Sequence, residues 1–156
     1  MPQLPFEIWR RRIESEYNQL ASRGFDFDVS EDHTEYLFRI TGDALCLKGG
    51  SLVPINCHEV FLRLKREYPY AGGFELVWKT PVFHPNIDDR GKVCIRLVNL
   101  WAAGQTLSSI VDALLQLLEN PNPESPLNYE AAQYYLENPK PKATGGFRLS
   151  RPKIVG

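Results

Sequence analysis

Hydrophobic residues near the start of the chain recur at steps of three and four, and this spacing predicts an amphipathic helix from Pro5 to about Ser22. Its apolar positions are Phe6, Trp9, Ile13, Tyr17 and Leu20. Pro5 suits the first turn of a helix, because proline has no backbone N–H to leave unpaired, and Gly24 suits the end. The chain therefore opens with a helix that buries one face.

Apolar and polar residues then alternate in several short stretches, which is typical of antiparallel strands with one buried face. The predicted strands lie at residues 35–40, 45–48, 59–65 and 74–78. Gly42-Asp43 predicts a break between the first two strands, and Gly49-Gly50 predicts a turn after the second. The short connections favour a meander, in which neighbours in sequence pair in the sheet.

A long stretch without clear periodicity runs from Thr80-Pro81 to Trp101. Irregular segments of this length inside a compact domain are commonly functional. Beyond it, Thr106 caps a predicted helix that ends at Asn120-Pro121, and a shorter helix is predicted from Asn128 to Asn138. One helix, a meander of strands and then further helices form an α+β pattern, in which helices pack on one side of a sheet.

Length and composition restrict the possible functions. A chain of 156 residues suits one domain, which we predict to span residues 1–138, followed by a loosely packed tail at 139–156 that has few apolar residues. The net charge of -1 argues against a nucleic-acid partner, because polyanions attract basic proteins. No apolar run approaches the roughly 20 residues of a membrane span. Three cysteines without CxxC spacing favour reduced thiols in the cytoplasm and argue against a metal site.

The candidate chemistry lies in the irregular stretch. Cys94 follows the turn Asp88–Gly91, and Asn86 lies eight residues upstream of it. A thiol can carry a thioester, and a carboxamide can donate a hydrogen bond to an oxyanion, so the pair suits acyl transfer. Each residue also has a structural alternative. Free cysteines are commonly buried, and an asparagine after proline can brace a turn.

Around these residues the sequence resembles the active-site region of ubiquitin-conjugating enzymes. The resembling runs are PVFHPNI at 81–87, GKVCI at 91–95, Trp101, PNPESPLN at 121–128 and, upstream, Tyr68-Pro69-Tyr70. The resemblance covers roughly residues 5–138. It implies the ubiquitin-conjugating fold, an α+β fold with an N-terminal helix, an antiparallel meander sheet, an active-site loop, and then central and C-terminal helices.

The resemblance implies that Cys94 accepts ubiquitin or a ubiquitin-like modifier as a thioester from an activating enzyme. The modifier then passes to a lysine of a protein substrate with the help of a RING-type ligase, and no cofactor is needed. Asn86 corresponds to a residue assigned either to oxyanion stabilisation or to holding the loop. Ser125 corresponds to a residue that gates or deprotonates the incoming lysine. Its alternatives are a turn-forming role, or the use of Glu124 as the proton acceptor instead.

Other positions carry supporting and partner roles by resemblance. The residues implied to support the active-site loop are His84, Pro85 and Trp101. The residues implied to contact the activating enzyme or the ligase are Arg11, Arg12 and Tyr70. The alternative for the two arginines is a solvated helix face with no partner.

The sequence also departs from the family pattern. Gly72-Gly73 stand where paired prolines are usual, Arg96 stands where many members have aspartate, and Ala102-Ala103-Gly104 replace a Ser-Pro-Ala ligase loop. The family usually has two further C-terminal helices, and this chain looks shortened there. These departures indicate a divergent member, of the kind that a minimal, prokaryotic-type ubiquitin-like system would use.

Two other functions remain as alternatives. A non-catalytic variant of the same fold would only bind ubiquitin, but such variants typically lack the cysteine that stands here at position 94. A cysteine protease needs a positioned histidine base, and His33 and His58 have no motif around them and are interpreted as incidental. Cys46 and Cys57 are predicted to pack in the core.

Overall fold

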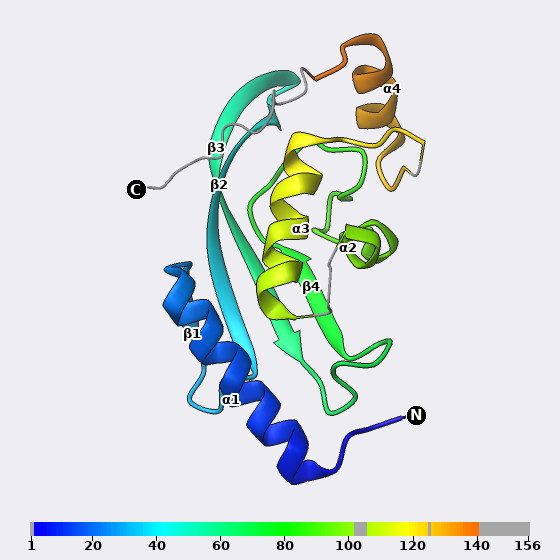
Figure 1. Ribbon diagram of the computed structural model, residues 1–156. Coiled ribbons are helices and arrows are strands. Elements are labelled where there is room, and N and C mark those ends of the chain that lie inside the picture. The colour runs from blue at the N-terminus through cyan, green and yellow to red at the C-terminus, as the bar shows by residue number, and fades with distance from the viewer. Residues whose placement is uncertain (1, 102–105, 125, 141–156) are drawn as a thin grey trace.

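The computed structural model describes residues 2–101, 106–124 and 126–140, with the backbone alone for residues 99–101 (Figure 1). The helices and strands are α1 (Phe6–Arg23), β1 (Asp26–Val29), β2 (Glu35–Lys48), β3 (Ser51–Leu64), β4 (Phe74–Trp78), α2 (Ile95–Trp101), α3 (Leu107–Glu119) and α4 (Tyr129–Glu137). The predicted α+β order is therefore confirmed, and α2 is a helix that the periodicity did not predict.

The strands form one antiparallel sheet in the order β1-β2-β3-β4, as the meander predicted. The predicted break at Gly42-Asp43 is wrong, because β2 runs through it. The register between β2 and β3 shifts between Thr41 and Ala44, so the extra residues form a bulge and pairing resumes beyond it. The sequence pattern also missed β1, a strand too short to show a clear alternation.

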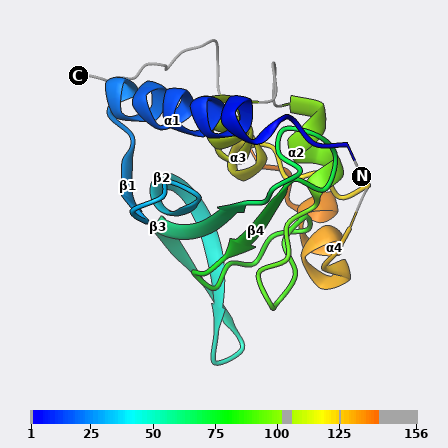
Figure 2. The ribbon, with the colours of Figure 1, turned by 90° about the horizontal axis from the view of Figure 1, so that it is seen from below.

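The helices α1 and α3 lie on the same side of the sheet (Figure 2). Thr106 caps α3, since its hydroxyl oxygen accepts a hydrogen bond from the backbone N–H of Ser109 at 3.2 Å. The helix α1 lies toward one end of the molecule and α4 toward the other (Figure 1). The core between α1, the sheet and α3 includes the buried residues Ile13, Leu20, Phe38, Leu62, Leu114 and Leu117.

The upper end of the sheet also anchors the segment that leads to the candidate site. The backbone N–H of Phe83 donates to the carbonyl oxygen of Leu45 at 2.7 Å, just after the bulge in β2. This hydrogen bond to the sheet therefore fixes where residues 84–86 begin.

Among the described residues, no helix combines the length and the apolar character needed to cross a membrane.

Candidate active site

Cys94 lies directly before α2, and its side chain is partly exposed. Its carbonyl oxygen accepts hydrogen bonds from the backbone N–H groups of Leu97 at 3.2 Å and Val98 at 3.3 Å. Its own backbone N–H donates to the carbonyl oxygen of Asn86 at 2.9 Å. The backbone of Cys94 is thus held on both sides, while its side chain is partly exposed.

The turn before Cys94 is built from Asp88 and Gly91. The Asp88 carboxylate accepts hydrogen bonds from the backbone N–H groups of Arg90 at 2.9 Å and Lys92 at 2.8 Å. Gly91 has a φ of 89°, and its carbonyl oxygen accepts a hydrogen bond from the backbone N–H of Trp78 at 2.8 Å. A β-carbon at position 91 would lie 2.2 Å from the Trp78 carbonyl oxygen, so this turn requires glycine to reach β4.

Asn86 is fully buried, with 0% of its surface exposed. Its side-chain nitrogen donates to the carbonyl oxygen of Asn122 at 2.8 Å, and its side-chain oxygen accepts from the backbone N–H of Asn122 at 2.8 Å. Both ends of the carboxamide therefore bind the backbone of one residue 36 positions away. This pairing ties the segment before Cys94 to the segment that follows α3.

His84 is also buried, and its ring lies against the last turns of α3. One ring nitrogen, Nε2, lies 2.7 Å from the carbonyl oxygen of Leu117, and the other, Nδ1, accepts from the backbone N–H of Asn86 at 3.0 Å. These partners require a neutral ring with its proton on Nε2. Burial lowers the pKa of His84 to about 4, because the cation would lose its solvation.

The segment after α3 lies against His84-Pro85-Asn86. The carbonyl oxygen of Pro85 accepts from the backbone N–H groups of Leu127 at 2.7 Å and Asn128 at 3.1 Å. Glu124 is exposed, and its backbone N–H donates to the Asn122 side-chain oxygen at 2.9 Å. Ser125 lies outside the described residues, as do the side chains of residues 99–101 and therefore that of Trp101.

Comparison with known proteins agrees with this geometry. A family model for ubiquitin-conjugating enzymes matches residues 12–145. The chain belongs to the ubiquitin-conjugating enzyme family. This membership confirms the predicted family and the fold that the resemblance implied, and it supports a transferase role in ubiquitin conjugation.

Several curated relatives carry the same family name. A probable ubiquitin-conjugating enzyme E2 of Acanthamoeba polyphaga mimivirus is 30% identical over 135 residues, which cover 80% of this chain and 81% of the relative. A probable ubiquitin-conjugating enzyme E2 of Arabidopsis thaliana is 28% identical over 133 residues, covering 82% of each chain. A Drosophila melanogaster ubiquitin-conjugating enzyme E2 is 29% identical over 106 residues, covering 63% of this chain and 69% of the relative.

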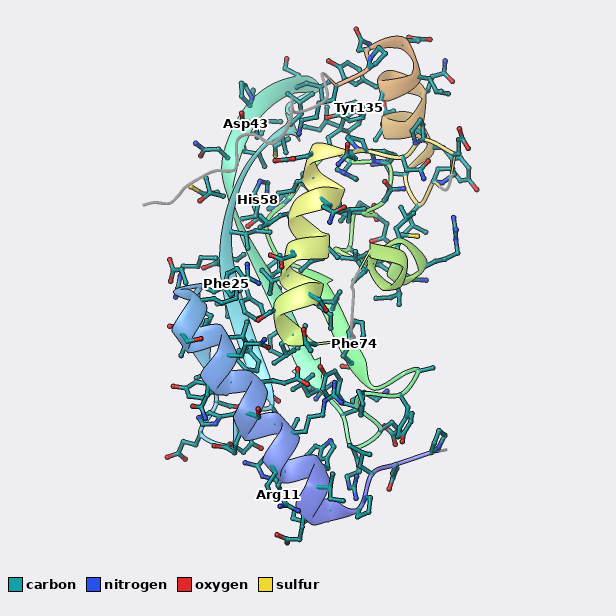
Figure 3. All side chains as sticks on the ribbon, in the orientation of Figure 1. Arg11, Phe25, Asp43, His58, Phe74 and Tyr135 are labelled. Atoms are coloured by element: carbon teal, nitrogen blue, oxygen red, sulfur yellow. The ribbon has the colours of Figure 1, made fainter. Side chains whose placement is uncertain are left out.

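The candidate partner residues of this ubiquitin-conjugating enzyme family member differ in their surroundings. Arg11 is exposed and lies in the first half of α1 (Figure 3). Tyr70 is also exposed, at 41% of its surface. Arg12 instead turns along the helix, and its Nε donates to a carboxylate oxygen of Glu16 at 2.6 Å. The structure therefore separates two arginines that the sequence analysis treated alike.

Glu16 is a buried carboxylate that the sequence analysis missed. Its second oxygen accepts from the Tyr68 hydroxyl at 2.5 Å and from the backbone N–H of Leu107 at 2.7 Å. Burial, together with this carboxylate, raises the pKa of the Tyr68 hydroxyl, which stays a donor. The signal was present in the sequence: Glu16 lies between Ile13 and Leu20 on the buried stripe of α1. A carboxylate on an apolar stripe requires internal partners.

Two further predictions about individual residues need correction. Cys57 does not pack in the core: it is exposed, whereas Cys46 is buried. Cys57 pairs with Thr41 at the bulge, where the alternation of buried and exposed positions along β3 is interrupted. His58 is not incidental to the fold, because it is buried, its Nε2 lies 2.9 Å from the Gly42 carbonyl oxygen and its Nδ1 accepts from Trp78 at 3.3 Å.

A groove of about 610 Å³ lies beside the candidate site. Its walls include the turn Asp88–Gly91, the segment 80–83 and residues 127–130 at the start of α4. Cys94 is not among the described residues that line it. The groove therefore lies next to the turn that precedes Cys94, and the partly exposed Cys94 does not form its wall.

Proposed function

We propose that this chain accepts ubiquitin or a ubiquitin-like modifier from an activating enzyme as a thioester on Cys94 and transfers it to a lysine of a protein substrate. Family membership supports the general role. The observation that carries the finer proposal is the position of Cys94, a partly exposed thiol on a backbone that Asn86 and the first turn of α2 hold in place.

The proposed reaction has two acyl transfers. In the first, the Cys94 thiolate attacks the carbonyl carbon of the upstream thioester, a new C–S bond forms, and the thiolate of the activating enzyme leaves. In the second, the neutral lysine amine attacks the carbonyl carbon on Cys94, an amide bond forms, the C–S bond breaks, and the departing Cys94 thiolate takes up the proton that the amine nitrogen releases. The only bonds exchanged are acyl bonds, so the proposal needs no resident cofactor.

Three residues are candidates to assist the second transfer. The lysine ammonium must lose a proton before it can attack, and the family resemblance makes Ser125, or Glu124 beside it in the sequence, the candidate to accept this proton. Asn86 is the candidate oxyanion donor, but its carboxamide binds the backbone of Asn122 at both ends. We therefore assign Asn86 first to holding the active-site loop against the segment after α3.

The proposed partner surface combines α1 and the Tyr68-Pro69-Tyr70 loop. Arg11 and Tyr70 are exposed and free of the internal network that holds Arg12. We propose that the activating enzyme and a RING-type ligase contact Arg11 and Tyr70 directly. Arg12 contributes through its contact with Glu16, which orders the junction between α1 and the loop.

Incubation with an activating enzyme, ubiquitin and ATP tests the proposal. We expect an adduct with ubiquitin that a thiol reductant removes. Cys94→Ser should give a reductant-resistant ester or no adduct, and Cys94→Ala should give none. Cys57→Ala is the matched control, because it removes the exposed thiol on β3 and should load as the unmodified chain does. An undiminished thioester in Cys94→Ala would contradict the proposal, and ubiquitin binding without any adduct would favour the non-catalytic alternative.

A further inference from the structure

Lys140, the last residue that the structure describes, reaches back into the fold. Its Nζ donates to the carbonyl oxygen of Asp43 at 2.6 Å and to the carbonyl oxygen of Leu118 at 2.7 Å. Asp43 belongs to the bulge in β2, and Leu118 lies in the last turn of α3. One ammonium group therefore joins three parts of the chain: the residues after α4, the sheet and the central helix.

Both partners of Lys140 are carbonyl groups that the regular hydrogen-bond pattern leaves without a donor. The last carbonyl oxygens of a helix have no partner within the helix, and they attract a positive charge. A bulge likewise removes backbone groups from the ladder. Burial lowers the pKa of Lys140, and the nearby carboxylates of Asp43 and Glu119 oppose that shift.

Two buried histidines complete the same arrangement. His84 donates to the carbonyl oxygen of Leu117, next to the one that Lys140 uses. The Nε2 of His58 lies 2.9 Å from the carbonyl oxygen of Gly42, next to the carbonyl of Asp43. Figure 3 shows His58 between the sheet and α3, below Asp43. Three basic side chains thus bind the carbonyl oxygens of two pairs of neighbouring residues, Gly42-Asp43 in the bulge and Leu117-Leu118 in α3.

A continuous series of hydrogen bonds leads from this junction to the candidate nucleophile. Lys140 and His84 hold neighbouring carbonyls of α3, and His84 Nδ1 accepts from the backbone N–H of Asn86 at 3.0 Å. The carbonyl oxygen of Asn86 then accepts from the backbone N–H of Cys94 at 2.9 Å. A shift in the last turn of α3 would therefore move the backbone that carries the thiol.

We propose that Lys140 is a positioning residue for acyl transfer: by holding the end of α3 on the β2 bulge it sets the place of His84, and through His84 and Asn86 the place of Cys94. The proposal rests on the proposed function, because it assigns Lys140 a role in the reaction at Cys94. A neutral side chain of similar length would fill the same volume and leave both carbonyl oxygens without a donor.

Single-turnover discharge tests this role. The full chain is loaded with ubiquitin, the activating enzyme is stopped, and free lysine is added at a temperature well below the melting point of every variant. Lys140→Met should slow the discharge by roughly tenfold, the scale on which residues that act through a network change a distant site. Lys140→Arg keeps a charged donor and should restore most of the rate.

Thr106→Ala is the matched control, because it removes a cap at the other end of the same helix. It should lower the melting temperature while leaving the discharge rate near that of the unmodified chain. If Lys140→Met does not fold, Lys140→Leu, which also removes the donor, takes its place in the comparison. A normal discharge rate in the folded variant would overturn the proposal.

Nuclear magnetic resonance gives a readout that does not depend on loading. In Lys140→Met the ring nitrogens of His84 and the backbone amides of Asn86 and Cys94 should change their chemical shifts, and Thr106→Ala should leave them unchanged. Absence of these shifts would overturn the positioning role. A chain that never loads ubiquitin, with the shifts present, would instead refute the proposed function and leave the structural link in place.

Discussion

Arg12 and Glu16 form a short ion pair, with 2.6 Å between the guanidinium Nε and a carboxylate oxygen, at the inner side of α1. Arg12 also lies over the Tyr68 ring at 5.6 Å. Glu16 in turn binds Tyr68 and the first residue of α3, Leu107. The helix that faces the proposed partners is therefore coupled to the Tyr68–Tyr70 loop and to the central helix.

The first prediction concerns the two neighbouring arginines. Reversing Arg11 to glutamate should raise the concentration of activating enzyme needed for loading, with an unchanged melting temperature, because Arg11 is exposed. Reversing Arg12 should also destabilise the fold, by about 2 kcal/mol, because a buried carboxylate loses a charged hydrogen bond and gains a like charge. Urea unfolding and loading kinetics on each single variant measure both effects.

Raised salt should weaken the contribution of Arg11 to loading more than the contribution of Arg12 to stability, because exposed charges are screened more strongly. If Arg12→Glu unfolds at the same urea concentration as the unmodified chain, the Glu16 network does not stabilise the junction. If Arg11→Glu loads normally, the outer face of α1 is only solvated.

The second prediction separates the two roles of Asn86. If Asn86 mainly braces the loop, Asn86→Ala leaves the backbone groups of Asn122 without these partners. The variant should then lose about 1–3 kcal/mol of stability, and both loading and discharge should be impaired. As an oxyanion donor alone, its loss should slow discharge by about 10²–10³ and spare stability and loading. Unfolding curves and single-turnover rates on the same preparation decide between them.

Asn86→Asp is the informative companion variant. Aspartate keeps an acceptor for the Asn122 N–H but turns a carboxylate oxygen toward the Asn122 carbonyl, which repels it. We expect this variant to be as unstable as Asn86→Ala, although it fills the same volume. Full stability in Asn86→Asp would argue against the brace.

The third prediction concerns acid stability. The pKa of His84 is about 4 in the folded chain, below the ordinary value of 6.5, so the unfolded chain takes up a proton before the folded chain does. The contribution of the neutral His84 ring to the free energy of unfolding is complete above pH 6.5. It is lost as the pH falls toward 4, by up to about 3 kcal/mol. The free energy of unfolding, measured in urea at a series of pH values, should show this slope.

A neutral replacement provides the control for the pH slope. His84→Gln offers an amide that can donate and accept, and it does not titrate. Its stability should depend less on pH between 6.5 and 4 than that of the unmodified chain. Burial also lowers the pKa of His58, so His58→Gln should remove a separate part of the slope. An unchanged slope in both variants would show that carboxylates elsewhere are responsible.

The fourth prediction concerns the end of the chain. Residues 139–156 contain few apolar residues, so a chain that ends at Lys142 should keep its melting temperature and load ubiquitin. A chain that ends at Asn138 also loses Lys140 and its two hydrogen bonds, and it should be about 1–2 kcal/mol less stable. A large loss of stability in the chain that ends at Lys142 would show that residues 143–156 pack on the core.

Much of the fold is predictable from local patterns. The steps of three and four from Phe6 to Leu20 predict α1, and the polar Thr106 before an apolar stripe predicts α3 within a residue of its observed start. Both patterns report how a segment buries one face, and a helix of that length shows several repeats. The strand β1 spans only Asp26–Val29, and its register depends on β2. A short alternation carries no comparable signal.

The residues of the candidate site can likewise be predicted from the order of motifs along the chain, but the contacts that these residues make cannot. Cys94, Asn86 and His84 stand out because their residue types and spacing resemble a family. The pairing of Asn86 with Asn122 spans 36 residues, that of Glu16 with Leu107 spans 91, and that of Lys140 with Asp43 spans 97. No periodicity connects positions so far apart.

The family, the α+β order and the candidate cysteine can all be predicted from the sequence, because these depend on residue type and short-range spacing. Long-range packing sets the contact of Arg12 with Glu16, the exposure of Arg11 and the bulge at Gly42-Asp43 within a continuous strand. The physical reason is that a buried polar group must find a partner wherever packing brings one. The partner's place in the chain is then set by which helices and strands meet.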